Sequence, residues 1–278
     1  MNDKEAGQYW NENAVAWTTI ARAGFDIYRD YLNTPAFFDI LPNINNLSGI
    51  DIGCGEGHNT RLLAQKGARL KAIDISENFI NKAKEAGKTN PLDIEYLVAS
   101  ATELPFENAH FDFATSFMCL MDIPNPDKAL QEVYRALKPN GFLQFSITHP
   151  CFTTPHRKNL RNIINHKTYA IEVGDYFKNL NGRIDEWIFG ETPDDLKNKF
   201  PKFKTPIFNR TLTQWFNAIL DAGFIIEQIN EPYADNETVS KQPALQDTQI
   251  VAYFLHIRCR KPNEKITVAN KQHGNRLQ

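Results

Sequence analysis

The stretch "GIDIGCGEGHNTRLLA", residues 49–64, places three glycines within five positions, between an apolar run and an amphipathic segment. The apolar run has the pattern of a short buried strand, and the segment after it has the pattern of a helix. Glycines at 53, 55 and 57 permit backbone angles that other residues avoid and let a ligand approach the main chain. A tight turn needs only one such glycine, so we predict a ligand-binding loop between a strand and a helix.

Short apolar runs alternate with amphipathic segments along most of the chain. We predict strands at 49–52, 70–74, 94–99, 111–117, 142–147, 224–229 and 248–258. Helices are expected at about 57–66, 77–87 and 126–137, and a further one around the apolar stripe that runs from Leu212 to Leu220. Alternation of this kind produces right-handed crossovers and a mostly parallel sheet covered on both faces. The fold class predicted is therefore α/β, with a doubly wound sheet.

The distribution of residue types divides the chain into five segments. Residues 1–42 carry aromatic and aliphatic side chains at helical spacing and predict a cap of two helices. Residues 43–148 form the α/β core, and 149–209 break its rhythm with many Pro, Asn, Lys and aromatic residues. So long a segment predicts an insertion or lid after the fifth strand. Residues 210–260 complete the sheet, and 261–278 form a polar tail.

Composition excludes several classes of protein. The 278 residues carry a net charge of −2, which makes a nucleic-acid partner unlikely, and no run approaches the roughly 20 apolar residues of a membrane span. Cysteines 54, 119, 151 and 259 are scattered without a C-x-x-C pair, so neither a disulfide scaffold nor a metal site is expected. The polar opening "MNDKEAGQYW" lacks the apolar region of a secretion signal, and we expect a cytoplasmic protein. The oligomeric state is left open.

The spacing of the glycine loop limits the ligand. A dinucleotide fingerprint reads G-x-G-x-x-G, but the sixth position from Gly53 is His58. Glu56 would also place negative charge beside a pyrophosphate at the helix N-terminus, which is unfavourable. Asp51, just before the loop, suits a ligand with a cationic group. We therefore expect a cofactor that carries no phosphates.

A second carboxylate follows the second strand. Asp74 lies at the carboxyl tip of "KAID", where an acidic residue accepts hydrogen bonds from both hydroxyls of a ribose. The alternative, that Asp74 caps the helix at 77–87, is weaker because Ser76 is better placed for that role. A ribose-bearing ligand is the preferred interpretation.

Taken in order, "IDIGCGEG", "AIDIS", "ASATELPFENAHFDFATSF" and "ALKPNGFLQFSI" resemble the successive motifs of class I S-adenosylmethionine-dependent methyltransferases of the small-molecule type, similar to type 11. The resemblance covers about residues 48–148, and "TLTQWFNAILDAGFIIEQINEP" is similar to the terminal helix and strand of such enzymes. It implies a Rossmann-like, seven-stranded sheet in the order 3-2-1-4-5-7-6 with the seventh strand antiparallel. It also implies S-adenosylmethionine as cofactor, S-adenosylhomocysteine as product, no metal, and methyl transfer to a small-molecule acceptor.

The resemblance also implies residue roles. Asp51 would lie near the methionine amine, and the loop residues Gly53, Cys54 and Gly55 would lie along the methionine. Asp74 would hold the ribose, with Ile75 on one side of the adenine and Ala101 and Thr102 on its other side. Phe117 and Met118 would lie at the sulfonium. One position departs from the family, which often has an Asp there to accept from the adenine amine, whereas this chain has Ser100. A hydroxyl also accepts, so weaker adenine recognition is expected.

Four residues are candidates around the reacting methyl group. Arg22 in the cap is placed to pair with the methionine carboxylate. His149, at the end of the fifth strand, either takes a proton from the acceptor, contacts the substrate, or is a hydrogen-bonded structural residue. Asp122 either contacts the substrate or begins a turn, and Tyr176 either lines the substrate site or belongs to the core of the insertion.

Three other functions stay open. A nucleic-acid methyltransferase is one, since the insertion is rich in lysine, although "SFMCLMDIP" after the fourth strand lacks the proline-rich tetrapeptide of the nitrogen-methylating subclass. A dinucleotide-dependent oxidoreductase is disfavoured by the glycine spacing. A non-catalytic protein that binds S-adenosylmethionine is the third.

Overall fold

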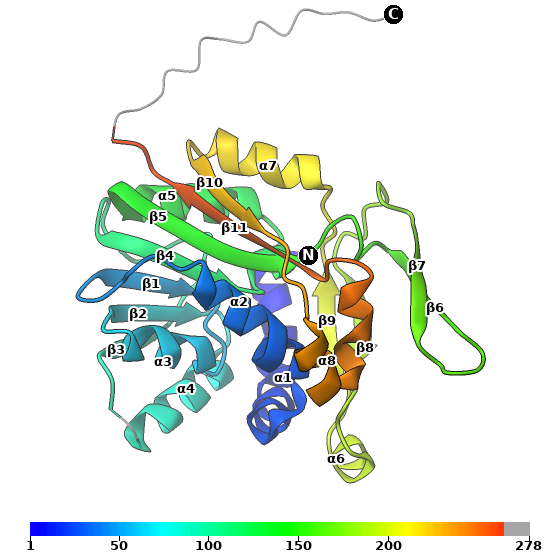
Figure 1. Cartoon of the computed structure of the whole chain (residues 1–278). Helices are drawn as coiled ribbons and strands as arrows, with labels where there is room; N and C mark the ends of the chain where they lie inside the picture. Colours follow the sequence, from blue (N-terminus) through cyan, green and yellow to red (C-terminus); the bar gives the residue numbers. More distant parts are fainter. Residues whose placement is uncertain (90, 264–278) are drawn as a thin grey trace, which may run out of the picture.

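A seven-stranded sheet forms the centre of the molecule in the computed structural model, which describes residues 1–89 and 91–263 (Figure 1). Its strands are β1 Ser48–Ile52, β2 Arg69–Asp74, β3 Ile94–Val98, β4 Phe111–Phe117, β5 Leu137–Thr148, β10 Ile225–Asn230 and β11 Phe254–Arg260. They run in the order β10-β11-β5-β4-β1-β2-β3, and β11 is antiparallel to both of its neighbours. This arrangement confirms the predicted fold class and strand order.

Helices cover both faces of the sheet. On one face lie α3 (His58–Gln65) and α4 (Glu77–Thr89), and on the other lie α5 (Pro126–Ala136) and α7 (Leu212–Asp221). In β1, Ile50 and Ile52 point into the core beneath α5 and α7, while Asp51 points toward α3. Apolar and acidic residues alternate in this strand because successive side chains face opposite sides of the sheet.

The cap differs in detail from the two predicted helices. It consists of α1 (Asp3–Ile20), α2 (Thr34–Asp39) and, between them, two π-helical turns at Ala21–Phe25 and Arg29–Asn33. Gly24, with φ of 87°, makes possible a kink inside the first of these turns. A π-helical turn holds more residues than an α-helical one, so positions after residue 20 face directions that a 3.6-residue period does not predict.

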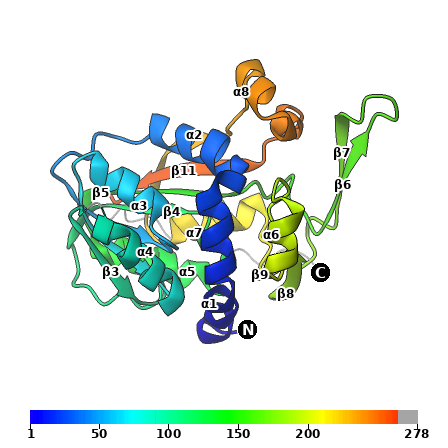
Figure 2. The ribbon, with the colours of Figure 1, turned by 90° about the horizontal axis from the view of Figure 1, so that it is seen from below.

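The insertion contains two β-hairpins. One hairpin joins β6 (His156–Arg161) to β7 (Thr168–Gly174) and projects from the body of the molecule, as both views show (Figures 1 and 2). The other joins β8 (Arg183–Trp187) to β9 (Phe203–Ile207), with the short helix α6 (Asp194–Lys199) between them. Figure 2 shows α1 between α4 and this second hairpin.

Packing and hydrogen bonds join the cap to the second hairpin. Asn13 of α1 donates to the backbone oxygen of Lys204 at 2.9 Å and accepts from its N–H at 3.0 Å. Trp17 packs edge-on against Trp187 and Phe189 with ring centroids about 5 Å apart (5.3 and 4.9 Å). The cap and the insertion therefore enclose one space above the sheet.

The predicted strand at 248–258 begins later than expected. The chain forms α8 (Asn236–Lys241) and a 3₁₀ helix at Pro243–Gln249 before β11 starts at Phe254. In that 3₁₀ helix the Thr248 hydroxyl donates to the oxygen of Leu245 at 2.7 Å, a local bond that competes with strand pairing. The last part of the predicted polar tail, 264–278, lies outside the described residues. Among the helices that are described, none is long and apolar enough to cross a membrane.

Candidate functional site

A cavity of about 680 Å³ lies at the carboxyl ends of the parallel strands, beneath the cap and the insertion. We call its two parts the cofactor end and the acceptor end. The cofactor end is lined by the loops after β1, β2 and β3, with Gly53, Gly55, Asp74, Ile75, Ser100 and Ala101. The acceptor end is lined by Asp122 after β4, by Arg157, Tyr176 and Arg210 from 149–210, and by Tyr28 and Tyr253.

Each glycine of the loop has a positive φ, but for different reasons. Their φ angles are 68°, 54° and 79° for Gly53, Gly55 and Gly57. A Cβ on Gly53 would lie 2.1 Å from the sulfur of Cys119, and one on Gly57 would lie 2.6 Å from the hydroxyl of Tyr96. A Cβ on Gly55 would meet nothing within 4 Å. Gly55 therefore presents bare backbone to the cavity, as a ligand-binding loop requires.

Asp74 holds this loop in place from the end of β2. Its Oδ2 accepts from the N–H of Gly55 at 2.8 Å, and its Oδ1 accepts from the N–H of Ser76 at 2.9 Å. Burial raises its pKa to about 6, although the backbone hydrogen bonds act in the opposite direction. The Ser76 hydroxyl accepts from the N–H of Phe79 and thus caps α4, as the sequence predicts. Asp74 is left as an acceptor that faces the cavity.

Asp51 is a second buried carboxylate at the same edge. It is 1% exposed and accepts from the hydroxyls of Thr60 at 2.6 Å and Thr115 at 2.9 Å. Burial raises its pKa to about 6, and the two hydroxyls partly offset that effect. The carboxylate lines the cavity beside Gly53, where a cationic group of a ligand would stabilise its ionised form.

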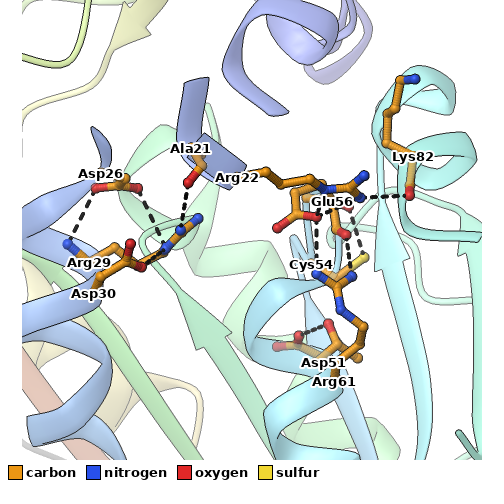
Figure 3. A network of polar contacts seen from close by, with 12 residues as sticks. Ala21, Arg22, Asp26, Arg29, Asp30, Asp51, Cys54, Glu56, Arg61 and Lys82 are labelled. Atoms are coloured by element: carbon orange, nitrogen blue, oxygen red, sulfur yellow. Dashed lines mark hydrogen bonds and ion pairs between the residues drawn. The ribbon is translucent and has the colours of Figure 1, made fainter. Parts of the chain in front are cut away.

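Arg22 belongs to a charged network over the glycine loop (Figure 3). Its guanidinium donates to Glu56 Oε2 at 2.8 Å and to the backbone oxygen of Lys82 at 2.9 Å. Arg61 donates to the same Glu56 oxygen at 3.1 Å. Arg22 is not among the described residues that line the cavity, whereas Arg29 is. The backbone leaves the helical conformation at Gly24 and Asp26, between the two arginines, so no helical period relates their directions.

The loop after β4 contains a residue in an unusual conformation. Met118 has a φ of 51°, which non-glycine residues seldom adopt, and its N–H donates to the oxygen of Ser146 at 3.0 Å. Phe117 packs on Phe37 of α2 with ring centroids 3.9 Å apart. Both Phe117 and Met118 line the cavity. Backbone strain of this kind gathers at functional sites.

Asp122 ends the short 3₁₀ helix Leu120–Asp122 and also lines the cavity. Burial raises its pKa well above the usual value for a carboxyl group. Within the described part of the chain, no cation and no hydrogen-bond donor lies against its carboxylate. Asp122 is thus an acidic side chain that lines the cavity and has no hydrogen-bond or ion-pair partner among the described residues.

His149 lies elsewhere. Its side chain is 4% exposed, its Nδ1 accepts from the N–H of Cys151 at 3.2 Å, and its Nε2 lies 2.8 Å from Glu231. Burial lowers its pKa, and Glu231 partly offsets that effect. The neutral ring therefore donates from Nε2 to Glu231, and both nitrogens are engaged within the protein. Of the described residues, those lining the cavity include Thr148 and Pro150 but not His149.

The structure brings together all the predicted site residues except Arg22, Thr102 and His149. Thr102 lies next to Ala101, but its hydroxyl contacts Asp3 of α1 instead of lining the cavity. Tyr176 does line the cavity, and its hydroxyl accepts from the N–H of Leu212 at 2.7 Å. Sequence reasoning missed the following lining residues: Asp3, Trp10, Arg29, Asn33, Arg157, Arg210 and Tyr253. For Trp10, the helical spacing of aromatic residues in the cap was a signal that could have indicated its place. The other missed residues reach the cavity through contacts between segments that are distant in the sequence.

Comparisons with known proteins agree with this geometry. A family model described as a methyltransferase domain matches residues 50–145. An uncharacterized protein of Haemophilus influenzae is 28% identical over 84% of this chain and 88% of its own length. The ubiquinone/menaquinone biosynthesis C-methyltransferase of Rickettsia prowazekii is 37% identical, but the match covers only 36% of this chain. The match spans 44% of that enzyme's length, so this chain matches less than half of the enzyme.

Among solved structures, an S-adenosylmethionine-dependent methyltransferase from Mesorhizobium loti superposes with a TM-score of 0.64 and 25% sequence identity. The similarity covers 81% of this chain and 96% of that one. The glycine loop, Asp74 and Asp122 all lie within the residues that the family model matches.

Proposed function

The chain belongs to the class I S-adenosylmethionine-dependent methyltransferases, and from this premise we propose that it methylates an O–H or N–H group of a small molecule bound at the acceptor end. The observation that carries this proposal is the Asp122 carboxylate, which faces the cavity without a partner among the described residues.

The cofactor end fits S-adenosylmethionine. Gly55 presents backbone with open space where a Cβ would be, and Asp74 retains free lone pairs for ribose hydroxyls. Asp51 offers a carboxylate for the methionine ammonium. When bound, S-adenosylmethionine supplies an electrophilic methyl group on a sulfonium. The protein's own contribution is to align the acceptor with that group and to exclude water.

Asp122 would receive the proton that the acceptor loses. A general base works best when its pKa lies near the working pH, and burial shifts the pKa of Asp122 upward in that direction. Asp122 and Met118 lie four residues apart after β4, and both line the cavity. His149 is not needed for this step, since its two nitrogens are engaged with Cys151 and Glu231.

The charges of the cavity indicate the class of acceptor. Each described arginine that lines it already donates to the protein: Arg29 to Asp30, Arg157 to Tyr253, and Arg210 to Asp127. None of these three arginines pairs with Asp122, although Arg157 donates only to neutral groups among the described residues. An unpaired acidic group disfavours an anionic acceptor and suits a neutral or cationic one. It also argues against a nucleic acid, whose backbone is anionic.

The aromatic lining indicates the shape of the acceptor. Side chains from three separate segments contribute rings to the cavity: Trp17, Tyr28, Tyr176, Trp187, Phe189, Phe208 and Tyr253. Such surfaces bind apolar or planar molecules, with a few polar groups to fix the orientation. We propose that the acceptor is a phenol, an aromatic amine or an N–H heterocycle.

The test is methyl transfer from labelled S-adenosylmethionine to a panel of phenols, amines and heterocycles. For an acceptor that is methylated, Asp122→Asn should lower kcat by about 100-fold or more, because the base is removed. Affinity for S-adenosylhomocysteine should stay within about twofold.

The control is Glu107→Gln, which removes an exposed carboxylate that neither lines the cavity nor pairs with a described residue that lines it. It should retain most of the activity. Unchanged turnover in Asp122→Asn would overturn the role of Asp122. Binding of S-adenosylhomocysteine without methylation of any acceptor class would favour a non-catalytic binding protein.

A further inference from the structure

The first residue of α1 brings a carboxylate to the cofactor end. Asp3 lines the same cavity as Ile75, Ser100 and Ala101. Its Oδ2 accepts from the hydroxyl of Ser100 at 2.9 Å and from the hydroxyl of Thr102. Ser100 and Thr102 are 97 and 99 residues away from Asp3 in the sequence, so these contacts join distant segments.

The position of Asp3 is determined by the docking of its helix. Asn11, two turns further along α1, accepts from the Ser76 hydroxyl at 3.0 Å and from the N–H of Asn78 at 2.9 Å. Gly7 lies against Ile75, where a Cβ would come within 3.0 Å of that side chain. The backbone of α1 therefore lies directly on the loop after β2, and Asp3 is held beside the loop after β3.

The hydrogen-bonding capacity of Ser100 is largely used within the protein. Its hydroxyl donates to Asp3, accepts from the N–H of Thr102 at 3.2 Å and lies 2.9 Å from the Thr102 hydroxyl. In contrast, Asp3 Oδ1 has no hydrogen bond to any described residue, since both contacts use Oδ2. Beside Ser100 and Ala101, the strongest remaining acceptor among the described residues is thus the Asp3 carboxylate.

We propose that Asp3 accepts the hydrogen bond from the 6-amino group of the cofactor's adenine and so selects adenosyl over 6-oxo purine cofactors. This inference rests on the proposed placement of S-adenosylmethionine at the cofactor end. Ser100 and Thr102 then act as positioning residues, because their hydroxyls direct the carboxylate. The cap would thus supply the acidic acceptor for the adenine amino group, which the loop after β3 lacks because it has Ser100 in place of an Asp.

A carboxylate at this place has a definite consequence for specificity. The carboxylate accepts a hydrogen bond from an amino group. A 6-oxo purine has a carbonyl oxygen at that position, which cannot donate a hydrogen bond and which the negative carboxylate repels. A site built to hydrogen-bond one group rejects an analogue that cannot make the bond, because the polar group of the site is left unpaired. The asparagine amide can rotate to donate to a carbonyl, so Asp3→Asn should relax this selection.

The experiment is calorimetric titration with S-adenosylhomocysteine and with S-inosylhomocysteine, which has an oxygen in place of the 6-amino group. The wild-type protein should prefer S-adenosylhomocysteine by at least about tenfold, the effect of one hydrogen bond to a charged group. Asp3→Asn should lose about tenfold in affinity for S-adenosylhomocysteine, and the ratio of the two affinities should fall to near one. Ser100→Ala should lose less, about threefold, because Asp3 remains.

Glu5→Gln is the matched control, since it removes one negative charge from the same first turn of α1 without touching the cavity. It should lower stability slightly and leave the ratio of affinities unchanged. The inference is overturned if the ratio in Asp3→Asn equals that of the wild type, or if Glu5→Gln changes it equally. If the wild-type protein binds neither compound, the proposed function fails together with the inference.

Discussion

The two ends of the cavity are built in different ways. At the cofactor end, Asp51 bonds to Thr60 and Asp74 bonds to Gly55, partners nine and 19 residues away. At the acceptor end, Tyr28 bonds to Asp247 across 219 residues. One end is formed by consecutive strand-to-helix loops, and the other by side chains from the cap, the insertion and the segment before β11. Recognition of the cofactor therefore depends on local motifs, and recognition of the acceptor depends on how distant segments pack.

The largest effect is expected at the cofactor end. Asp74→Ala removes the proposed partner of the ribose and leaves the N–H groups of Gly55 and Ser76 without an acceptor. Two hydrogen bonds to a charged group contribute about 3 kcal/mol or more, so affinity for S-adenosylhomocysteine should fall by about 100-fold. Calorimetric titration measures this loss.

Asp112→Asn provides the comparison for Asp74→Ala. Asp112 accepts from the N–H of Ser48 and pairs with Lys138, and it does not line the cavity. Its replacement should lower stability without changing affinity for S-adenosylhomocysteine. Equal loss of affinity in both variants would mean that Asp74 acts only through the stability of the sheet.

Two glycines distinguish backbone strain from contact with the cofactor. Gly24 and Gly55 both have positive φ, 87° and 54°, and a Cβ on either would meet nothing within 4 Å. Alanine at either position should cost about 1 kcal/mol of stability, measured by denaturant unfolding. Only Gly55→Ala should also lower affinity for S-adenosylhomocysteine, by about tenfold or more. A similar loss of affinity in Gly24→Ala would show that strain alone explains it.

The affinity for S-adenosylhomocysteine should depend on pH near 6. Burial raises the pKa values of Asp51 and Asp74 from 3.8 to about 6, and both are proposed to bind the cofactor as ionised groups. Affinity should therefore fall as the pH drops below 6, by up to about tenfold per pH unit for each proton taken up. Titrations between pH 5 and pH 8 measure this dependence, and a flat profile would contradict it.

The same two groups affect the stability of the free protein with the opposite sign. Because the folded protein holds these protons more tightly than the unfolded chain, the two carboxyls contribute stability below pH 3.8 that is lost as the pH rises through about 6. Asp74→Asn should reduce this loss, since the amide does not titrate. Denaturant unfolding of the two proteins at pH 5 and pH 7 provides the measurement.

The smallest effect is expected at the acceptor end. Tyr28→Phe removes the hydroxyl that contacts Asp247 at 3.1 Å, and stability should fall by about 1 kcal/mol. The KM for the acceptor should rise by a few fold, while affinity for S-adenosylhomocysteine stays constant. If affinity for S-adenosylhomocysteine changed as much as KM, the two ends would not be separable.

The same contrast explains what the sequence could predict. The α/β class, the glycine loop and the side chains at the ends of β1 and β2 follow from alternation and from spacing within short segments, whereas the strand order came from the resemblance to a known family. Arg22 was selected because a guanidinium in the cap could pair with the methionine carboxylate, but its side chain bonds to Glu56 and it is Arg29 that lines the cavity. Asp3 carried no signal of its own, since its place depends on how α1 docks on the loops after β2 and β3. His149 was selected for its chemistry, but Cys151 and Glu231 engage both of its nitrogens.

Thermal unfolding with S-adenosylhomocysteine, S-adenosylmethionine and NADH in parallel tests most directly whether the cofactor end binds an adenosyl sulfonium compound. A ligand at about a hundred times its dissociation constant adds about 2.7 kcal/mol to the free energy of unfolding. We predict a rise with both adenosyl compounds, none with NADH, and a loss of the rise in Asp74→Ala. A rise with NADH, or none with any of the three at millimolar concentration, would contradict the assignment of the cofactor and the residue roles built on it.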